Sequence, residues 1–474
     1  MRGALALVLH AHMPYVEGFG TWPFGEEWLW EAISCVYVPL LGIVEEAPVT
    51  VGLTPVLCDQ LELLPGEAGT RLRRYLREVK APLHARDAAD LASGGGAPEA
   101  AEVRRAAGDY VAAEEALEAI GGDLLGAFRR AADGGPLELM TSAATHAILP
   151  LLATRAGLRL QLETGISSHR RRFGSFSGGF WLPECAYEPG LEHELARHGA
   201  STFVVDQTRA HGLGAPEQLE PVATEAGAVA VPLDWEAVAR VWSNESGYPA
   251  DPVYRDYHRG SPGGAHPWAS GGGPYSHGDA LAQARRDADD FVVRAIERLD
   301  RHARERGRPG LLCCPFDAEL LGHWWYEGPV WLAAVLDEAA RRGLELVTLS
   351  DGVERTQPVR RTLTSSTWGR GKDLSTWDSP AVAELVFTAR AAELELVSGA
   401  SRWDRDDLAA AARELLALQS SDWAFMASRG PAEPYARERA RGHAQALAGR
   451  SDGAFTPTTR GLAPTLEVAP LLGP

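Results

Sequence analysis

The feature that most constrains this chain is the alternation of short apolar runs with longer helical segments. The apolar runs cover residues 5–9, 49–53, 137–140, 202–205, 228–231, 310–314 and 344–349. Most of them are apolar throughout, which is typical of parallel strands buried on both faces. Helical periodicity fills the intervals, for example over 100–132, 191–198, 280–305 and 330–342. This order predicts an α/β barrel with helical insertions, whose functional residues follow the strands at the carboxyl face.

Composition and charge narrow the class of protein further. Of the 474 residues, 45% are hydrophobic and 23% are charged, which is the composition of a folded globular protein. The formal net charge of −18 opposes binding to phosphate backbones and to anionic membrane surfaces. We therefore expect no nucleic-acid partner and no membrane partner. A neutral or cationic substrate is easier to accommodate.

The pattern predicts two folded domains and a tail. We expect a catalytic barrel over 1–355, with a helical insertion near 60–135 between its strands. Apolar runs typical of strands are not found after about residue 355. Segments rich in Ala, Arg, Glu and Leu at 407–419 and 434–448 predict a C-terminal helical domain over 356–455. The proline-rich end, 456–474, is expected to be a flexible tail.

The cysteines and the N-terminus indicate where the protein works. Its five cysteines are an odd number without a C-x-x-C pair, which argues against a disulfide framework and a structural zinc site. The apolar run at 4–9 is short for a signal peptide and ends in His10-Ala11-His12, so a first strand is the better interpretation. We expect a cytoplasmic protein that binds no metal.

Common cofactor and hydrolase motifs are missing from the sequence. Gly371-Lys372 is followed by Asp373 in place of Ser or Thr, and no G-x-G-x-x-G follows a strand. No serine stands in a G-x-S-x-G elbow. We expect neither a nucleotide cofactor nor any other.

Two carboxylates stand in unusually apolar surroundings. Glu184 lies within FWLPECAY over 180–187, and Asp317 directly follows the apolar run LLCCPF over 311–316. An acid in such a context is paired, protonated or functional, because unpaired burial of a carboxylate is costly. The sequence leaves two interpretations open: paired-carboxylate chemistry at the rim of one barrel, or two acids that cap helices or accept backbone hydrogen bonds.

At these two segments the chain resembles glycoside hydrolase family 57, specifically its 1,4-α-glucan branching enzyme group. The resemblance is carried by WLPECAY at 181–187 and PFDAELLGHWW at 315–325, which match the two catalytic motifs of the family. Three further segments match in order, namely HAHMPY at 10–15, THAILP at 145–150 and LLALQSSDW at 415–423. The set is collinear over nearly the whole chain.

The resemblance implies a distorted seven-stranded (β/α) barrel with a helical insertion and a C-terminal helical domain that closes the cleft. It implies a retaining mechanism without a metal, in which Glu184 is the nucleophile and Asp317 the general acid/base. The implied function is a glycogen-type 1,4-α-glucan branching enzyme, with an α-1,4-glucan as substrate. The alternatives are an α-1,4-glucan hydrolase or 4-α-glucanotransferase on the same scaffold, and a non-catalytic glucan-binding protein.

Histidines and tryptophans near the strand ends are candidate substrate-binding residues. His10 and His12 are two residues apart, so they share one face of a strand. We expect them and His146 to bind sugar hydroxyls or to orient a carboxylate, the alternative being ordinary core histidines. Trp22 lies in an aromatic-rich segment with Trp28, and indole faces suit pyranose rings. The alternative is that these tryptophans close the barrel end.

Further candidates lie in the second half of the chain. His323 and Trp324 belong to the second catalytic motif, and Trp368 and Trp377 lie in a Ser/Thr/Gly-rich stretch that cannot easily bury them. The family pattern implies additional glucan contacts by Arg255, Gly272, Trp368 and Asp422. Asp422 has an alternative interpretation as a helix-terminal acid.

The chain departs from the family pattern at two segments. Residues 260–273 read GSPGGAHPWASGGG, which is richer in glycine than is usual for the family, and we expect a loose loop there. The stretch 228–242 contains no tyrosine, whereas the family's transferases are expected to place one on a loop over the cleft. The sequence therefore predicts branching accompanied by a substantial hydrolytic leak.

Overall fold

The computed structural model describes residues 2–21, 24–243, 245–430, 432–448, 459 and 461–473. Trp22 lies outside these described residues. Within them nine strands form one sheet: β1 (Ala4–Ala11), β2 (Thr50–Leu53), β3 (Glu138–Ser142), β4 (Gly179–Trp181), β5 (Thr202–Val205), β6 (Val222–Ala223), β7 (Val229–Pro232), β8 (Leu311–Asp317) and β9 (Leu346–Val347). Their order is β6-β7-β5-β4-β3-β2-β1-β8, and β9 pairs with β1.

The sheet curls into a distorted barrel. The seven strands from β7 through β1 to β8 are mutually parallel, while β6 joins the edge antiparallel to β7. The two ends of this row approach each other where the amide of Asp234, just after β7, donates to the carbonyl of Cys313 in β8 at 3.0 Å. The structure thus confirms the predicted seven-stranded barrel and adds two short strands.

The predicted apolar runs coincide with seven of the nine strands. The two that the sequence analysis missed are β4 and β6, which are three and two residues long. A strand of two or three residues shows no hydrophobic periodicity in the sequence, because one or two apolar residues are compatible with any secondary structure. β4 is nevertheless central to the sheet, and it leads directly into the segment that contains Glu184.

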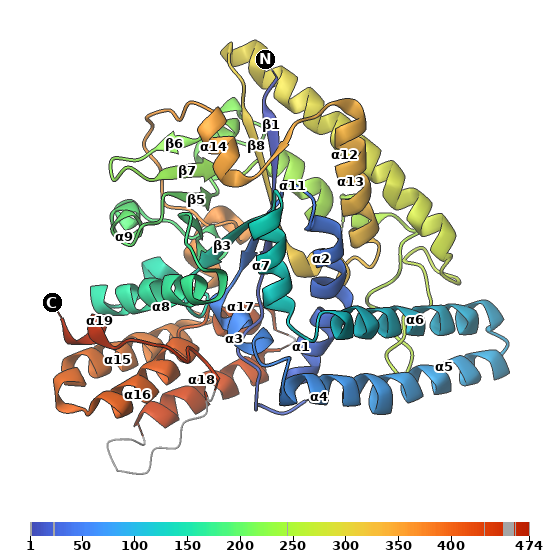
Figure 1. Ribbon diagram of the computed structural model, residues 1–474, viewed down its shortest axis with the longest axis horizontal. Helices are drawn as coiled ribbons and strands as arrows, with labels where there is room; N and C mark the ends of the chain where they lie inside the picture. Colours follow the sequence, from blue (N-terminus) through green and yellow to red (C-terminus); the bar gives the residue numbers. More distant parts are fainter. Residues whose placement is uncertain are drawn as a thin grey trace.

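Helices cover the outside of the barrel and form the C-terminal domain (Figure 1). The helices up to the last strand are α1 (Glu26–Ala32), α2 (Val38–Val44), α3 (Pro55–Leu61), α4 (Glu67–Arg74), α5 (Ala81–Ser93), α6 (Ala97–Ala119), α7 (Leu124–Gly134), α8 (Arg155–Phe173), α9 (Leu191–Arg197), α10 (Thr208–His211), α11 (Trp235–Trp242), α12 (His277–Arg306) and α13 (Gly328–Arg342). They are followed by α14 (Leu349–Arg355), α15 (Ala383–Gly399), α16 (Arg405–Leu418), α17 (Ser421–Arg429), α18 (Glu433–Ala448) and α19 (Ala469–Leu472).

The segment expected as one helix over 100–132 is two helices, α6 and α7. Gly121 and Gly122 break it with backbone φ angles of 65° and 76°, a left-handed conformation that glycine adopts without a Cβ penalty. Asp123 then begins α7, because its carboxylate accepts from the Gly126 amide at 2.9 Å.

The insertion between β2 and β3 carries α4 to α7, and the antiparallel pair α5 and α6 projects from one side of the molecule (Figure 1). Before it, α1 and α2 form one continuous helical stretch, Glu26–Val44, through a π-helical turn. This stretch is long and apolar enough to cross a membrane, with a mean hydropathy of 1.4. However, 56% of it is buried inside the molecule, where its apolar side chains belong to the main core.

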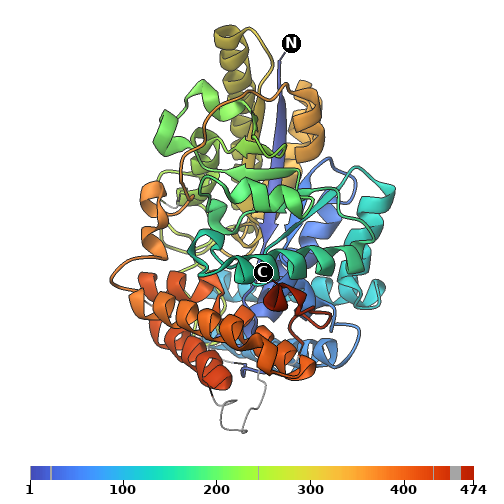
Figure 2. The same cartoon turned by 90° about the vertical axis from the view of Figure 1, so that its left-hand side faces the viewer.

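The chain does not leave the barrel at residue 355. Residues 356–378 run back along it: the Ala223 amide donates to the carbonyl of Val359 at 2.8 Å, and Tyr187 and Ser366 exchange two backbone hydrogen bonds. The helical domain proper therefore begins with α15, and its helices pack beneath the barrel (Figures 1 and 2). The domain boundary therefore lies about 27 residues after the predicted one, because a segment without its own periodicity shows no sign of its partners.

The predicted tail, 456–474, differs from the structure where it is described. Leu462, Leu466, Val468 and Leu471 are buried in one hydrophobic cluster with α16. The Ala463 amide also donates to buried Asp59 at 2.7 Å. These apolar side chains are removed from water, so this part of the segment is packed against the fold.

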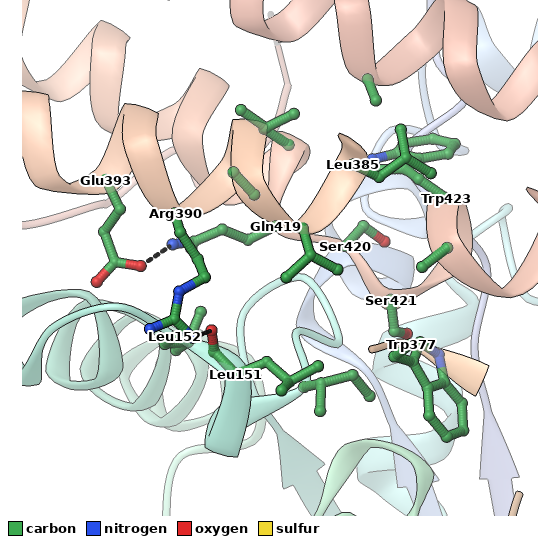
Figure 3. A pocket seen from close by; sticks show the side chains of 16 residues that line it. Leu151, Leu152, Trp377, Leu385, Arg390, Glu393, Gln419, Ser420, Ser421 and Trp423 are labelled. Atoms are coloured by element: carbon green, nitrogen blue, oxygen red, sulfur yellow. Dashed lines mark hydrogen bonds between the residues drawn. The ribbon is translucent and has the colours of Figure 1, made fainter. Parts of the chain in front are cut away.

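The barrel and the helical domain are joined around a small cavity of about 60 Å³ (Figure 3). Glu393 of α15 accepts hydrogen bonds from the Thr154 amide at 2.7 Å and from the Gln419 side chain at 2.9 Å. Arg390 donates to the carbonyl of Leu151 at 3.0 Å. Buried polar groups on both sides are thus satisfied by each other, and α17 is held in a fixed position over the barrel mouth.

Candidate active site

A cavity of about 630 Å³ lies at the carboxyl ends of the strands. The predicted residues that line it from the barrel strands and their following turns are His10, His12, His146, Glu184 and Asp317. Those that line it from later loops and from α17 are His323, Trp324, Trp368, Trp377 and Asp422. The structure therefore brings together ten of the residues singled out from the sequence. Such a concave site at the carboxyl face is where a (β/α) barrel carries its chemistry.

Glu184 is presented to the cavity by a strained turn. It follows β4 in a short 3₁₀ turn, and its backbone φ of 59° lies in the left-handed region, as does that of Cys185 at 51°. Such a conformation costs roughly 1–3 kcal/mol for a residue with a side chain, and it is found at functional sites. The turn is fixed by hydrogen bonds from the Cys185 amide to Leu182 at 2.8 Å and from the Ala186 amide to Pro183 at 2.9 Å.

Trp368 binds Glu184 at two points. The amide of Trp368 donates to the Glu184 carbonyl at 2.9 Å, and its indole Nε1 donates to Glu184 Oε2 at 2.8 Å. Burial raises the pKa of Glu184 to about 7, while the indole hydrogen bond opposes this by stabilising the anion. The side chain is 18% exposed, so its other oxygen, Oε1, is open to the cavity.

Three histidines on the floor of the cavity form a stack with the buried ring of Trp181. The ring of His10 lies 4.5 Å from that of Trp181 and 4.9 Å from that of His146, which lies 4.1 Å from His12. His10 Nε2 is 3.0 Å from His146 Nε2, and His146 Nδ1 is 2.8 Å from the Ser421 hydroxyl. The rings are stacked face to face, and no metal-binding group of three ligands occurs among the residues that the structure describes.

The histidines differ in charge. Burial holds the pKa of His10 and of His146 well below the ordinary value, so both are neutral at physiological pH. Burial alone would also lower the pKa of His12, but Asp422 at 3.0 Å from its Nε2 raises it above the ordinary value. His146 Nδ1 lies 3.8 Å from Glu184 Oε1, which places a neutral ring beside the free oxygen.

Asp317 ends β8, where it is the register partner of His10 in β1. Register partners in a parallel pair point to the same face, so both side chains face the barrel interior. Burial raises the pKa of Asp317 well above the ordinary value, and the charges of Glu319 and Glu184 raise it further. Asp317 therefore keeps its proton in conditions where an exposed aspartate would lose it.

Glu319 was not singled out from the sequence, although it lines the cavity. Its Oε1 accepts from the Tyr37 hydroxyl at 2.6 Å and from the His12 amide at 3.0 Å. Glu319 could have been predicted from its position two residues after Asp317, because this spacing places both acids at the end of the same strand. Burial raises the pKa of Glu319, while its hydrogen bonds from Tyr37 and His12 oppose this by favouring the charged form.

The helical domain completes the site with Ser421 and Asp422 at the start of α17. Asp422 lies in the first turn, where the helix dipole favours a negative charge. Burial alone would raise the pKa of Asp422, but the neighbouring His12 holds it at about 2. Asp422 is thus a charged partner of His12 that lines the cavity, and it ties the two domains together.

The two tryptophans predicted as sugar platforms have different surroundings. Trp368 is partly buried and faces the cavity beside Glu184. Trp377 is only 1% exposed and packs with Leu418 and Trp423 of the helical domain. The Ser/Thr/Gly-rich sequence around Trp377 could not show that α16 and α17 cover it. A buried ring cannot offer a face to a sugar, so the structure supports a platform only at Trp368.

Arg255 and Gly272 lie outside the lining of this cavity. The Arg255 guanidinium pairs with Glu102 of α6 and lies 3.4 Å from the centre of the Tyr326 ring. Gly272 is exposed in a turn, with a φ of 88°. Their predicted glucan contacts have no support from this arrangement, because the Arg255 guanidinium is engaged by Glu102 of the helical insertion and by the Tyr326 ring.

The glycine-rich segment 260–273 is packed and not loose. Asp87 of α5 is buried and accepts from the Ser261 hydroxyl and from the Gly263 amide, the latter at 2.9 Å. Ala265 packs with Ala88 and Val103 in a small hydrophobic cluster. The expectation of a loose loop was wrong because its anchoring partner lies in a helix about 175 residues earlier in the chain.

Two tryptophans of the cavity were not singled out from the sequence as substrate contacts. Trp235 and Trp242 stand at the two ends of α11, in the stretch where the sequence analysis noted a missing tyrosine. Trp28, which was grouped with Trp22 as a candidate sugar contact, lies on α1 and also lines the cavity. A tryptophan at each end of an amphipathic helix, directly after a strand, is the signal that could have found Trp235 and Trp242.

The arrangement suits acid-assisted attack on a glycosidic bond. Glu184 and Asp317 face one cavity, and the charge of each makes the other harder to ionise. The hydrogen bond from Trp368 favours the anion at Glu184, whereas the surroundings of Asp317 favour its protonated form. A carboxylate and a carboxylic acid with such different environments are the two groups that glycoside cleavage uses.

Comparison with known protein families gives two matches. The model described as glycosyl hydrolase family 57 matches residues 6–364, and the model described as 1,4-alpha-glucan branching enzyme, C-terminal, matches residues 389–450. The chain is 33% identical to the 1,4-alpha-glucan branching enzyme of Thermococcus kodakarensis, over 94% of this chain and 73% of that protein. It is 34% identical to a probable 1,4-alpha-glucan branching enzyme of Mycobacterium tuberculosis, over 94% and 91% of the two chains.

Solved structures give the same result. The branching enzyme of Pyrococcus horikoshii superposes with a TM-score of 0.90 at 31% identity, covering 99% of this chain and 97% of that one. The α-amylase AmyC of Thermotoga maritima superposes with a TM-score of 0.83 at 25% identity, covering 99% and 98%. Each of these similarities spans both the barrel and the helical domain.

Proposed function

The chain belongs to glycosyl hydrolase family 57, and from this premise we propose that it is a 1,4-α-glucan branching enzyme with a retaining mechanism. The observation that carries the proposal is the common cavity of Glu184 and Asp317, whose wall includes α17 of the helical domain. That helix lies within the segment 389–450, which matches the C-terminal model of branching enzymes. The substrate is accordingly an α-1,4-glucan.

In the first step Glu184 attacks the anomeric carbon of the glucan. Oε2 is held by the Trp368 indole, so Oε1, which faces the cavity, is the attacking atom. Protonated Asp317 donates its proton to the glycosidic oxygen as the C1–O bond breaks. The shortened glucan leaves with the new hydroxyl, and the remaining segment is bonded covalently to Glu184.

In the second step the proton moves in the opposite direction. Asp317 is now ionised and takes the proton from the 6-hydroxyl of an acceptor glucan. That oxygen attacks the anomeric carbon, the bond to Glu184 breaks, and an α-1,6 linkage forms with the original anomeric configuration. If water attacks in place of the 6-hydroxyl, the same chemistry is hydrolysis.

The polar floor of the cavity supports both steps. Neutral His10 and His146 provide ring nitrogens that hydrogen-bond without adding charge beside Glu184. The positively charged form of His12 is paired with Asp422, so its charge is already compensated. The site therefore binds an uncharged sugar while its proton balance is set by Glu184 and Asp317.

Hydrolysis of α-1,4-glucans is the second candidate function. It is favoured by the similarity to the α-amylase AmyC and by the absence of a tyrosine from 228–242. The same retaining pair would serve it, with water as the acceptor. A loose segment at 260–273 is no longer an argument for it, since that segment is packed against α5.

Product analysis on amylose distinguishes the two functions. The purified protein is incubated with amylose, and new α-1,6 linkages and new reducing ends are counted over time. A branching enzyme forms linkages in excess of reducing ends and lowers the iodine absorbance. Reducing ends without α-1,6 linkages would assign the chain to hydrolysis and contradict the proposal.

We also propose that the enzyme contributes to glycogen synthesis in the cytoplasm. All five cysteines are free in the structure, which suits a reducing compartment. Cell fractionation followed by immunodetection tests the location, and glycogen chain-length analysis of cells without the protein tests the role. Detection only outside the cytoplasm, or glycogen with unchanged branching, would contradict this proposal.

A further inference from the structure

The cavity has two aromatic walls, and each is connected to a different carboxylate. On the Glu184 side, the Trp368 indole donates to Glu184, and the Trp242 ring centre lies 5.5 Å from that of Trp368. Trp242 is 36% exposed although it ends a helix that is otherwise packed on the barrel. This wall therefore adjoins the group that forms the covalent bond to the sugar.

On the Asp317 side, the wall is built around Trp324. Its amide donates to the carbonyl of Glu319 at 3.2 Å, which ties it to the turn that follows Asp317. Its ring centre lies 4.7 Å from that of Tyr257 and 5.1 Å from that of His323. The Tyr257 hydroxyl is 3.4 Å from His323 Nε2, so the three rings form one connected group.

Trp324 is exposed beyond what folding requires. Half of its surface, 50%, is accessible to solvent, while the next residue, Trp325, is 2% exposed and fills the core. The backing of Trp324 is ordered, because Tyr257 also stacks on His266 with an interplanar angle of 3°, within the segment that Asp87 anchors. A large, exposed and rigidly supported indole is suited to stacking on the apolar face of a pyranose ring.

The chemistry assigns different sugars to the two walls. Glu184 bonds to the anomeric carbon of the donor, so the donor segment extends along the Glu184 side. Asp317 protonates the departing oxygen and later deprotonates the attacking one, so the leaving chain and then the acceptor chain occupy the Asp317 side. In the second step only the acceptor is present there.

We propose that Trp324, supported by Tyr257 and His323, is the platform on which the acceptor glucan binds, while Trp242 and Trp368 bind the donor segment. The proposal rests on the proposed transferase function and adds a location for its second substrate. In the second step the C1–O bond to Glu184 breaks, the bond from C1 to the acceptor O6 forms, and the O6 proton passes to Asp317. Trp324 acts by holding the acceptor oxygen near Asp317 in competition with water.

An activated donor separates the two steps. α-Maltotriosyl fluoride forms the glycosyl-enzyme without a leaving glucan, so fluoride release reports the first step, and maltoheptaose is then offered as the acceptor. Three variants are compared with wild type: Trp324→Ala, Trp242→Ala, and Phe387→Ala as a control on α15. Phe387 is 70% exposed and lies outside the cavity lining.

We expect Trp324→Ala to lower the ratio of transfer to fluoride release at least about fivefold, the effect of one aromatic stacking contact. Trp324→Phe should restore part of this ratio. Trp242→Ala should lower fluoride release at limiting donor and leave the ratio unchanged, and Phe387→Ala should leave both unchanged. Thermal melting of each variant shows whether the fold is intact.

An unchanged ratio in folded Trp324→Ala, or an equal fall of the ratio in Trp242→Ala, would overturn the platform. The failure of the proposed function is seen separately, in the wild-type products. If wild type transfers only to 4-hydroxyls, the branching function fails, and the platform is still judged by the same ratio. If wild type transfers to no sugar at all, both fail.

Discussion

Glu184 and Asp317 share a cavity but are supported in opposite ways. Glu184 stands in a left-handed turn, and a hydrogen bond from Trp368 reaches one of its oxygens. Asp317 ends a regular strand, and within the described part of the chain its carboxyl receives no hydrogen bond. Burial raises its pKa, and the charges of Glu319 and Glu184 raise it further. Strain and a hydrogen-bond donor position an anion, whereas burial and negative charge retain a proton, and this difference separates the proposed nucleophile from the proposed acid.

The largest expected effect comes from removing the nucleophile. Glu184→Gln should lower both cleavage and transfer on amylose by at least roughly 10⁴-fold, because no covalent intermediate can form. Iodine absorbance and reducing-end assays measure the loss. The matched control is Glu188→Gln, an exposed glutamate on the same loop, which should retain wild-type activity. Near-normal activity of Glu184→Gln would contradict the role of Glu184 as nucleophile and with it the proposed difference between Glu184 and Asp317.

Asp317→Asn should have a smaller effect that depends on the leaving group. On amylose we expect a loss of about 10²–10⁴-fold, the usual contribution of a general acid. On α-maltosyl fluoride the first step should be nearly normal, since fluoride leaves without protonation. Fluoride release and amylose turnover are measured in parallel. Equal losses on both substrates would mean that Asp317 is not the proton donor.

Asp422 is a third carboxylate with the reverse property, a pKa lowered to about 2 beside His12. A lowered folded-state pKa stabilises the fold above the ordinary aspartate pKa, and this contribution is lost as the pH falls through about 2. Asp422→Asn should therefore lower the free energy of unfolding by about 2 kcal/mol at pH 7, and by less at acid pH. Urea unfolding at both pH values measures this, and a loss independent of pH would contradict it.

The smallest change is expected from Glu319→Gln. Activity requires ionised Glu184, so the acid limb of the pH profile should lie near the Glu184 pKa of about 7. The alkaline limb reports loss of the proton from Asp317. Without the negative charge of Glu319 that proton is lost more easily, so the alkaline limb should move to lower pH while the acid limb moves little. An unmoved alkaline limb would show that Glu319 does not act on Asp317.

The sequence predicted the parts of the site that depend on local order. Asp317 directly follows a predicted strand, so it was expected at the barrel mouth. Paired chemistry with Glu184 was one of two interpretations left open, and both residues line the cavity. The two-residue spacing of His10 and His12 likewise predicted a shared face, and their rings stack 6.0 Å apart. Strand direction and side-chain alternation are sufficient for the positions of Asp317, His10 and His12.

The parts that the sequence could not predict depend on distant partners. Arg255 is paired with Glu102, which lies 153 residues earlier in the sequence. Trp377 is covered by helices of the C-terminal domain. Asp87 orders a glycine-rich segment whose composition alone indicates a loose loop. Composition describes what a segment can do in isolation, and packing between domains decides what it does in the fold.

The central claim is that Glu184 forms the covalent bond to the sugar while Asp317 transfers the proton. It is tested most directly by incubating Asp317→Asn with α-maltosyl fluoride, quenching, digesting with protease and sequencing the glycosylated peptide by mass spectrometry. We expect a maltosyl group to accumulate on Glu184, because the deprotonation that starts the second step is lost. A sugar on any other residue, or turnover without an adduct and with inverted product configuration, would contradict it.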